Sequence, residues 1–174
     1  ELVRFSTEAE PLFDGLVAPT DANRARAEAF VQGFKPSGGT AIQDALAAAL
    51  APSAGRAAAD RPYVIVFLTD GKPTIGPTAT DEIVDAVMKR MGGQTVRVFC
   101  FGIGTDVNTH LLDLITEKTR AASRYVLPEE DLELKVSSFY AKINEPVLTD
   151  LDLDVAGGIR VSTLVPAVLP DLFR

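Results

Sequence analysis

The fold of this chain is decided by one stretch of its sequence, YVIVFLTDG, residues 63–71. It holds six consecutive apolar residues, from Tyr63 to Leu68, without the polar alternation of a strand that has one face in water. Such a run is typical of a parallel strand covered on both faces, and it is far too short to cross a bilayer. Asp70 and Gly71 then stand at the carboxyl end of a buried strand, where open parallel sheets bind their ligands.

Helical and strand patterns alternate on both sides of this stretch. Short apolar runs predict further strands at residues 2–5, 96–101 and 124–126, the first of them within a hairpin. Apolar residues at helical spacing predict helices at residues 23–35, 40–50, 80–91, 108–115 and, after Pro128, 132–143. This order implies parallel strands joined by right-handed crossovers. We therefore expect an α/β fold, a doubly wound and mostly parallel sheet with helices on both faces.

Polar side chains mark two of the predicted helix starts. Thr40 and Asn108 stand where an N-cap is expected, because a short polar side chain accepts a hydrogen bond from the first turn. In the helix predicted at residues 40–50, the apolar spacing leaves Gln43 and Asp44 facing outward.

The last part of the chain changes character. Leu151–Val155 alternates apolar and acidic residues with period two, Ala156–Gly158 favours a turn, and Ile159–Val161 returns. The pattern predicts a β-hairpin. We place the domain boundary before Val147, so that residues 1–146 form the main domain and residues 147–174 form the hairpin or a linker to a following module.

Composition narrows the classes of function. The net charge of −7 and the isoelectric point near 4.7 argue against a nucleic-acid surface, which needs clustered Lys and Arg, and suit divalent cations instead. Cys100 is the single cysteine, so it has no internal disulfide partner, and its apolar surroundings in the sequence predict a small buried side chain. His110 is the single histidine, and no catalytic constellation of Ser, Cys and His is visible around it, which favours a non-enzymatic role.

Oxygen-bearing residues gather at the predicted strand ends. Gly38 and Gly39 permit close backbone approach and place the Thr40 hydroxyl at a helix start, while Asp70 and Gly71 follow the buried strand. Hydroxyl and carboxylate oxygens are the ligands that Mg²⁺ prefers. Thr40 and Asp70 are therefore candidate metal ligands, within a candidate ligand-binding rim formed by Gly38, Gly39 and Gly71, although Asp70 before Gly71 by itself favours a turn.

Several motifs together resemble the von Willebrand factor type A domain. The motifs are GGTAI at residues 38–42, FLTDG at residues 67–71 and VFCFGIG at residues 98–104. Two further stretches, PTIG at residues 73–76 and NEPVLTD at residues 144–150, are similar to the inter-alpha-trypsin inhibitor heavy-chain branch of that family and its bacterial relatives. The resemblance covers nearly the whole chain.

The resemblance implies a metal-ion-dependent adhesion site, in which Mg²⁺, Mn²⁺ or Ca²⁺ bridges the domain to an acidic side chain of a protein partner. Thr40 matches the family's threonine ligand and Asp70 its aspartate. The first motif of the family, Asp-x-Ser-x-Ser at the end of the central first strand, is absent from the printed sequence. The domain is therefore expected to lack its N-terminal part, and its central strand position to be filled by a strand outside this sequence, by a strand-swapped homodimer or by closure of the neighbouring strands.

Other interpretations of the same residues stay open. Asp70 before Gly71 is also typical of a simple turn, or of a metal- or nucleotide-dependent hydrolase that uses this carboxylate at the strand end. A purely structural module with a degenerate metal site is a third possibility. We expect no membrane insertion, and the resemblance alone favours an extracytoplasmic or secreted location.

Overall fold

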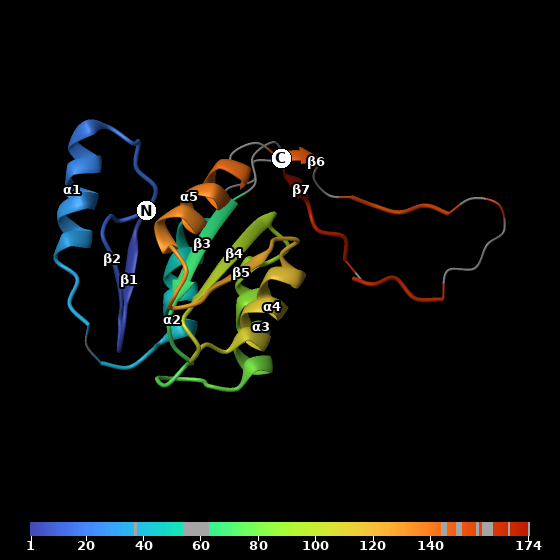
Figure 1. Cartoon of the computed structure of the whole chain (residues 1–174), viewed down its shortest axis with the longest axis horizontal. Coiled ribbons are helices and arrows are strands. Elements are labelled where there is room, and N and C mark those ends of the chain that lie inside the picture. The colour runs from blue at the N-terminus through green and yellow to red at the C-terminus, as the bar shows by residue number, and fades with distance from the viewer. Residues whose placement is uncertain are drawn as a thin grey trace. The chain divides into compact units, whose positions relative to one another are not determined.

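A computed structural model describes residues 1–36, 38–53, 63–143, 146–148, 151–155, 157, 162–166 and 168–173. The chain divides into two compact units, and their helices and strands are labelled in Figure 1. The first unit contains Glu1–Tyr63 and Gly71–Thr95, and the second contains Val64–Asp70 and Val96–Arg174. Among the described helices, none is long and apolar enough to span a membrane.

The first unit opens with the predicted hairpin. Strands β1 (Val3–Phe5) and β2 (Ala9–Pro11) pair antiparallel, and Arg4 lies opposite Glu10, with which it forms an ion pair. Helix α1 (Asp21–Gln32) begins two residues before its predicted start, because the Thr20 hydroxyl caps it by accepting a hydrogen bond from the Asn23 backbone N–H at 3.3 Å.

The core of the first unit is built by two helices that pack against each other, α2 (Ile42–Leu50) and α3 (Thr80–Met91). A short 3-10 turn, Ala51–Ser53, follows α2. The buried side chains recur at the spacing of one helix face, and they include Ile42, Leu46 and Leu50 of α2 and Ile83, Val84 and Val87 of α3. Gly92 ends α3 in the left-handed conformation, with φ of 58°.

Two sequence predictions about α2 are wrong. The helix begins at Ile42 behind Ala41, which makes no side-chain cap hydrogen bond, so Thr40 is not the N-cap. The backbone of Thr40 is instead hydrogen-bonded to Thr74, in another loop. Gln43 does not face fully outward either: it is half-buried, and its Oε1 is buried without a hydrogen-bond partner among the described residues.

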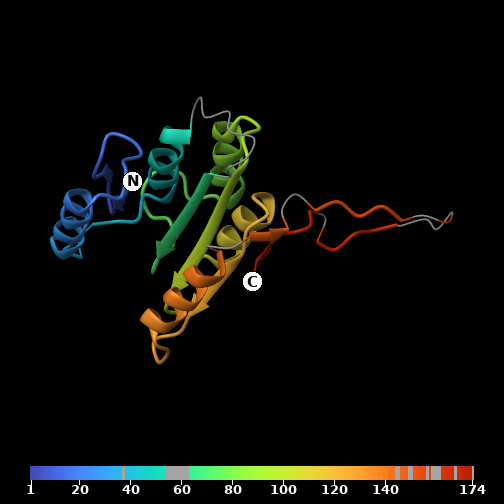
Figure 2. The ribbon, with the colours of Figure 1, turned by 90° about the horizontal axis from the view of Figure 1, so that it is seen from above.

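The second unit is a three-stranded sheet in the order β3 (Tyr63–Thr69), β4 (Val96–Ile103) and β5 (Ser123–Val126). Strands β4 and β5 are parallel, with Cys100 opposite Ser123 and Ile103 opposite Val126. Helix α4 (Thr109–Lys118) joins them and packs along β4 (Figure 2). The predicted α/β class with a parallel sheet is confirmed.

Aromatic side chains join the sheet to the last helix, α5 (Leu132–Ile143). Phe99 and Phe101 point to the same face of β4, and each ring makes a T-shaped contact with the ring of Phe139. The centroid of Phe139 is 5.2 Å from that of Phe99 and 4.6 Å from that of Phe101. Cys100 lies between them in the strand and is fully buried, as the sequence predicted. Strand β4 is therefore covered on both faces.

The prediction that the Tyr63–Leu68 run is covered on both faces is wrong. Ile65 and Phe67 are buried, whereas Val64, Val66 and Leu68 are 46%, 41% and 40% exposed. In the part of the chain that the structure describes, β3 lies at the edge of the sheet and has a neighbouring strand on its β4 side alone.

In the described part of the C-terminal tail, the first arm of the predicted hairpin is not a strand. Leu151–Val155 is described without strand structure, and the predicted turn and return, residues 156 and 158–161, lie outside the described residues. A different pair forms instead: β6 (Pro146–Leu148) lies antiparallel to β7 (Leu172–Phe173), with Leu148 opposite Leu172. The assignment of residues 147–174 to a separate module stays a prediction.

Candidate functional site

The loop before α2 requires its two glycines. Gly38 has φ of 77°, a conformation that side chains disfavour, and a Cβ added there would clash with the Thr7 hydroxyl. A Cβ on Gly39 would clash with the side chain of Ile75 and lie 2.8 Å from Thr74 Oγ1. The glycines thus let three segments of the first unit come together around Thr40.

Hydrogen bonds hold the Thr40 backbone on both sides. Its N–H donates to Thr74 Oγ1 at 2.7 Å, and its carbonyl accepts from the Thr74 N–H at 3.0 Å. The loop is also tied to the first hairpin, because the Gly39 N–H donates to Thr7 Oγ1 at 3.2 Å and the Ala41 N–H to the Ser6 carbonyl at 2.8 Å. This fixed backbone leaves the half-buried Thr40 side chain in a defined position.

Gly71 lies beside the Thr40 side chain. A Cβ built on Gly71 would be 3.2 Å from Thr40 Oγ1, so any larger residue would crowd the hydroxyl. Of the predicted site residues, the first unit therefore brings together Gly38, Gly39, Thr40 and Gly71. Asp70 is exposed and belongs to the second unit, where it follows the last residue of β3. Its convergence with Thr40 on one cation stays a prediction.

Sequence reasoning missed two hydroxyl residues of this loop cluster, Thr7 and Thr74. Thr74 lies within the PTIG stretch, which carried a family resemblance but was given no role. Thr7 offered no signal, because it stands in a hairpin turn 32 residues away from the Gly39 N–H that it accepts. Both side chains act as acceptors for backbone N–H groups, so they position the loop.

The carboxyl end of β4, where Gly102-Ile103-Gly104 stands, is covered by a side chain of the second unit itself. A Cβ on Gly102 would lie 2.7 Å from Cδ1 of Tyr125. The Tyr125 hydroxyl donates to Asp113 Oδ1 at 2.6 Å. Partial burial, and then this hydrogen bond to the Asp113 carboxylate, raise the pKa of Tyr125. The hydroxyl therefore stays protonated as a donor, and Gly102 at this strand end makes room for the Tyr125 ring.

The predicted metal ligands, Thr40 and Asp70, are oxygen ligands of the type that a hard divalent cation prefers, but they are too few. Mg²⁺ takes about six oxygen ligands, and the predicted set supplies one hydroxyl, from Thr40, and one carboxylate, from Asp70. Among the described residues, no group of three or more His, Cys, Asp and Glu side chains could hold a metal. A cation at this loop therefore needs waters and further oxygen ligands beyond these two side chains.

Comparison with known proteins gives a consistent family. The von Willebrand factor type A domain family matches residues 1–124. The chain is 32% identical to human inter-alpha-trypsin inhibitor heavy chain H4 over 153 residues, which is 85% of this chain and 16% of that protein. The bovine heavy chain H4 is 29% identical over 179 residues, covering all of this chain and 19% of the relative. The chain thus spans less than a fifth of these relatives.

Solved structures agree on the fold. A von Willebrand factor type A protein from Catenulispora acidiphila superposes with a TM-score of 0.61 at 23% identity, over 79% of this chain and 31% of that one. Proximal thread matrix protein 1 from the mussel byssus, described with a zinc-occupied MIDAS motif, gives a TM-score of 0.56 at 22% identity, over 78% of this chain and 32% of that one.

Proposed function

Because the chain belongs to the von Willebrand factor type A domain family, we propose that it is a non-enzymatic protein-interaction module whose partial Mg²⁺-dependent site uses Thr40 and Asp70. The family to which it belongs consists of interaction and adhesion modules. Beyond this family role, we propose that these two residues bind the metal and that the partner supplies an acidic side chain. We also propose that the chain has no catalytic activity.

One observation carries the proposal: the Thr40 backbone is fastened to Thr74, and Gly71 leaves its hydroxyl uncrowded. Asp70 directly precedes Gly71 in the chain, so its carboxylate belongs to the residue next to the one that faces this hydroxyl. A bound Mg²⁺ would supply a positive charge that attracts a partner's carboxylate. The protein residues hold the hydroxyl in place before any ligand arrives, which reduces the entropy that binding loses.

A structural relative also supports the proposal that the interaction depends on a metal ion. The mussel protein is described with its MIDAS motif occupied by zinc, which is a statement about that protein. For this chain we propose Mg²⁺ first, and Mn²⁺ or Ca²⁺ as alternatives that also take oxygen ligands. An extracytoplasmic or secreted location, and a strand-swapped homodimer as a further partner, belong to the same proposal.

The test is calorimetric titration of Mg²⁺ into two proteins: the chain as printed, and the chain joined at Glu1 to a strand that carries Asp-x-Ser-x-Ser. We expect weak or no heat from the first and saturable binding from the second, because the added motif supplies the missing oxygen ligands. Asp70→Ala should abolish the heat of the longer protein. Asp85→Ala, which removes an exposed carboxylate from α3, is the matched control and should leave the heat unchanged.

If the longer protein has a native circular dichroism spectrum but gives no heat of Mg²⁺ binding, the metal role is wrong. That result would favour a structural module with a degenerate site. Hydrolysis of a phosphate ester or a nucleotide that is lost in Asp70→Ala would instead overturn the non-enzymatic assignment. Both assays use the same protein samples.

A further inference from the structure

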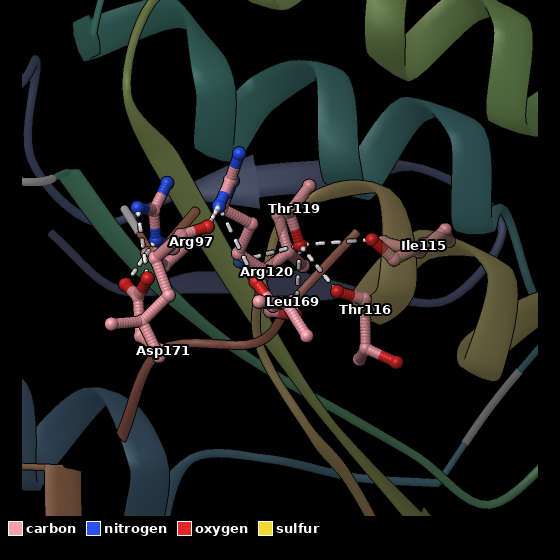
Figure 3. A network of polar contacts seen from close by, with 9 residues as sticks. Arg97, Ile115, Thr116, Thr119, Arg120, Leu169 and Asp171 are labelled. Atoms are coloured by element: carbon pink, nitrogen blue, oxygen red, sulfur yellow. Dashed lines mark hydrogen bonds and ion pairs between the residues drawn. The ribbon is translucent and has the colours of Figure 1, made fainter. Parts of the chain in front are cut away.

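The far end of the C-terminal tail is fastened to the sheet by a buried ion pair (Figure 3). Arg97 of β4 and Asp171 are 5% and 6% exposed. The Arg97 Nε donates to Asp171 Oδ2 at 2.6 Å and its Nη2 donates to Oδ1 at 3.3 Å, so the contact is bidentate. A buried arginine needs such a partner, because its charge has lost contact with water.

Arg120 holds the same segment through backbone atoms. Its carbonyl accepts from the Asp171 N–H at 3.1 Å. Its Nη1 donates to the Leu169 carbonyl at 3.4 Å (Figure 3) and to the Leu151 carbonyl at 3.0 Å, so it contacts both ends of the intervening loop. Pairing of β6 with β7 closes the loop beside these contacts. We call Arg97 and Arg120 the arginine clamp.

The loop between these anchors carries exposed apolar side chains. Leu153 is 58% exposed and Val165 is 85% exposed. In both views the described parts of the loop extend away from the helices and strands of the second unit (Figures 1 and 2). The tail therefore has a fastened end, Asp171 with β7, on a loop from which Leu153 and Val165 are exposed.

We propose that this fastened end is exchanged between two copies of the chain, so that Asp171 and β7 of one copy occupy the arginine clamp and pair with β6 of the other. The exchange conserves every contact named above, because the two copies are identical, and this is the usual route to domain-swapped dimers. The inference deepens the interaction-module proposal by naming a second copy as partner, and it needs no metal.

The clamp selects its occupant by chemistry. The buried Arg97 requires a carboxylate, which this chain's own Asp171 supplies, while Arg120 donates to the backbone carbonyl of Leu169 and β7 supplies a strand for β6. A second copy offers the same groups in the same order.

Concentration decides between the closed and the exchanged form. Within one copy, the loop presents its end at an effective concentration on the order of millimolar. The closed monomer is therefore expected in dilute solution, and the swapped dimer gains population as the protein concentration approaches that value.

A disulfide across β6 and β7 reports which copy supplies each strand. Leu148 and Leu172 are opposite each other, and they are 51% and 48% exposed, so the double variant Leu148→Cys and Leu172→Cys should keep the fold. The native Cys100 does not compete, because it is fully buried. The variant is oxidised with oxidised glutathione in chelator-containing buffer, at protein concentrations from about 10 µM to about 1 mM, the range that spans the effective concentration.

We expect a cross-linked monomer at the dilute end and an increasing share of covalent dimer at the concentrated end, with mass-spectrometric mapping to 148–172 links between copies. Leu153→Cys alone is the matched control, since it places one thiol on the exposed loop and measures collisional dimers. Monomer throughout the range, dimer no more abundant than in the control, or 148–148 links alone would overturn the exchange. Because the chelator removes divalent cations, failure here leaves the metal proposal untouched.

Adding Asp171→Asn to the double variant tests the clamp itself. The change removes the charge that Arg97 pairs with, so oxidation should give fewer 148–172 links of both kinds, within and between copies. Unchanged yields would show that the arginine clamp does not hold the exchanged end.

Discussion

Strands β3 and β4 have similar sequences and different surroundings. Strand β3 reads YVIVFLT and carries no charge, yet alternate residues on one face are 40% to 46% exposed. Strand β4 reads VRVFCFGI and includes Arg97, yet its first seven residues are all buried. The difference shows that an uninterrupted apolar run indicates only that both faces of a strand can be buried. Whether both faces are buried depends on the elements that pack against the strand.

Neighbours explain the difference. Strand β4 has a strand on each side, Phe139 of α5 against Phe99 and Phe101, and helix α4 packed along it. Its one charged residue is buried because Asp171, 74 positions later, supplies the opposite charge. Strand β3 has its described strand neighbour on the β4 side alone.

The largest expected effect comes from the covered strand. Phe101→Ala removes a fully buried ring whose centroid is 4.6 Å from that of Phe139, and should lower the free energy of unfolding by about 3–5 kcal/mol. Urea unfolding followed by circular dichroism measures the loss. A loss below about 1 kcal/mol, the range of surface substitutions, would show that β4 is not packed on this face.

A smaller effect should appear at alkaline pH through Cys100. Burial, and then the charge of Asp113, raise the pKa of this thiol in the folded protein above its ordinary value of 9.0. Above pH 9 the unfolded chain releases the proton and the folded one keeps it, so stability falls as pH rises, by about 1.4 kcal/mol per pH unit. Below pH 9 the thiol is protonated in both states and contributes no slope.

The measurement is urea unfolding of the native chain and of Cys100→Ala between pH 8 and pH 10. The alanine variant has lost the thiol, so the difference in stability between the two proteins should change above pH 9 and stay constant below it. A constant difference over the whole range would show that the thiol ionises as readily in the folded protein as in the unfolded chain.

The smallest effect is expected on the exposed face of β3. Val66→Thr replaces a 41% exposed side chain by one of similar shape that suits a strand, and should change the free energy of unfolding by less than about 0.5 kcal/mol. Ile65→Thr is the matched control on the buried face, where the side chain is 7% exposed and an added hydroxyl should cost about 1–3 kcal/mol. Equal losses at the two positions would mean that both faces of β3 are covered.

Much of the fold was predictable because it rests on local patterns. Helical spacing found α2 and α3, the apolar runs found β3 and β4, and Asn108 caps α4 as expected, accepting from the Leu111 N–H at 3.1 Å. The strand predicted at Leu151–Val155 was wrong for a related reason. Alternating apolar and polar residues form a strand only where another strand pairs with them, and β7 pairs with β6 instead.

The candidate site was predictable in part. Gly38, Gly39, Thr40 and Gly71 do come together, since glycines and a hydroxyl before a helix, and a glycine after a buried strand, carry a signal in the sequence. Thr40 was misread as a helix cap because its true contact, Thr74, lies 34 residues away. The contribution of Thr7 was invisible for the same reason.

By itself, the sequence determined where helices and strands form and which of their residues are apolar, because spacing, capping and turn chemistry act within a few residues. The tertiary structure alone decided which faces are covered, that Arg97 is buried against Asp171, and that Thr7 and Thr74 hold the Thr40 loop. Those outcomes depend on contacts between residues far apart in the chain, for which the sequence carries no local pattern.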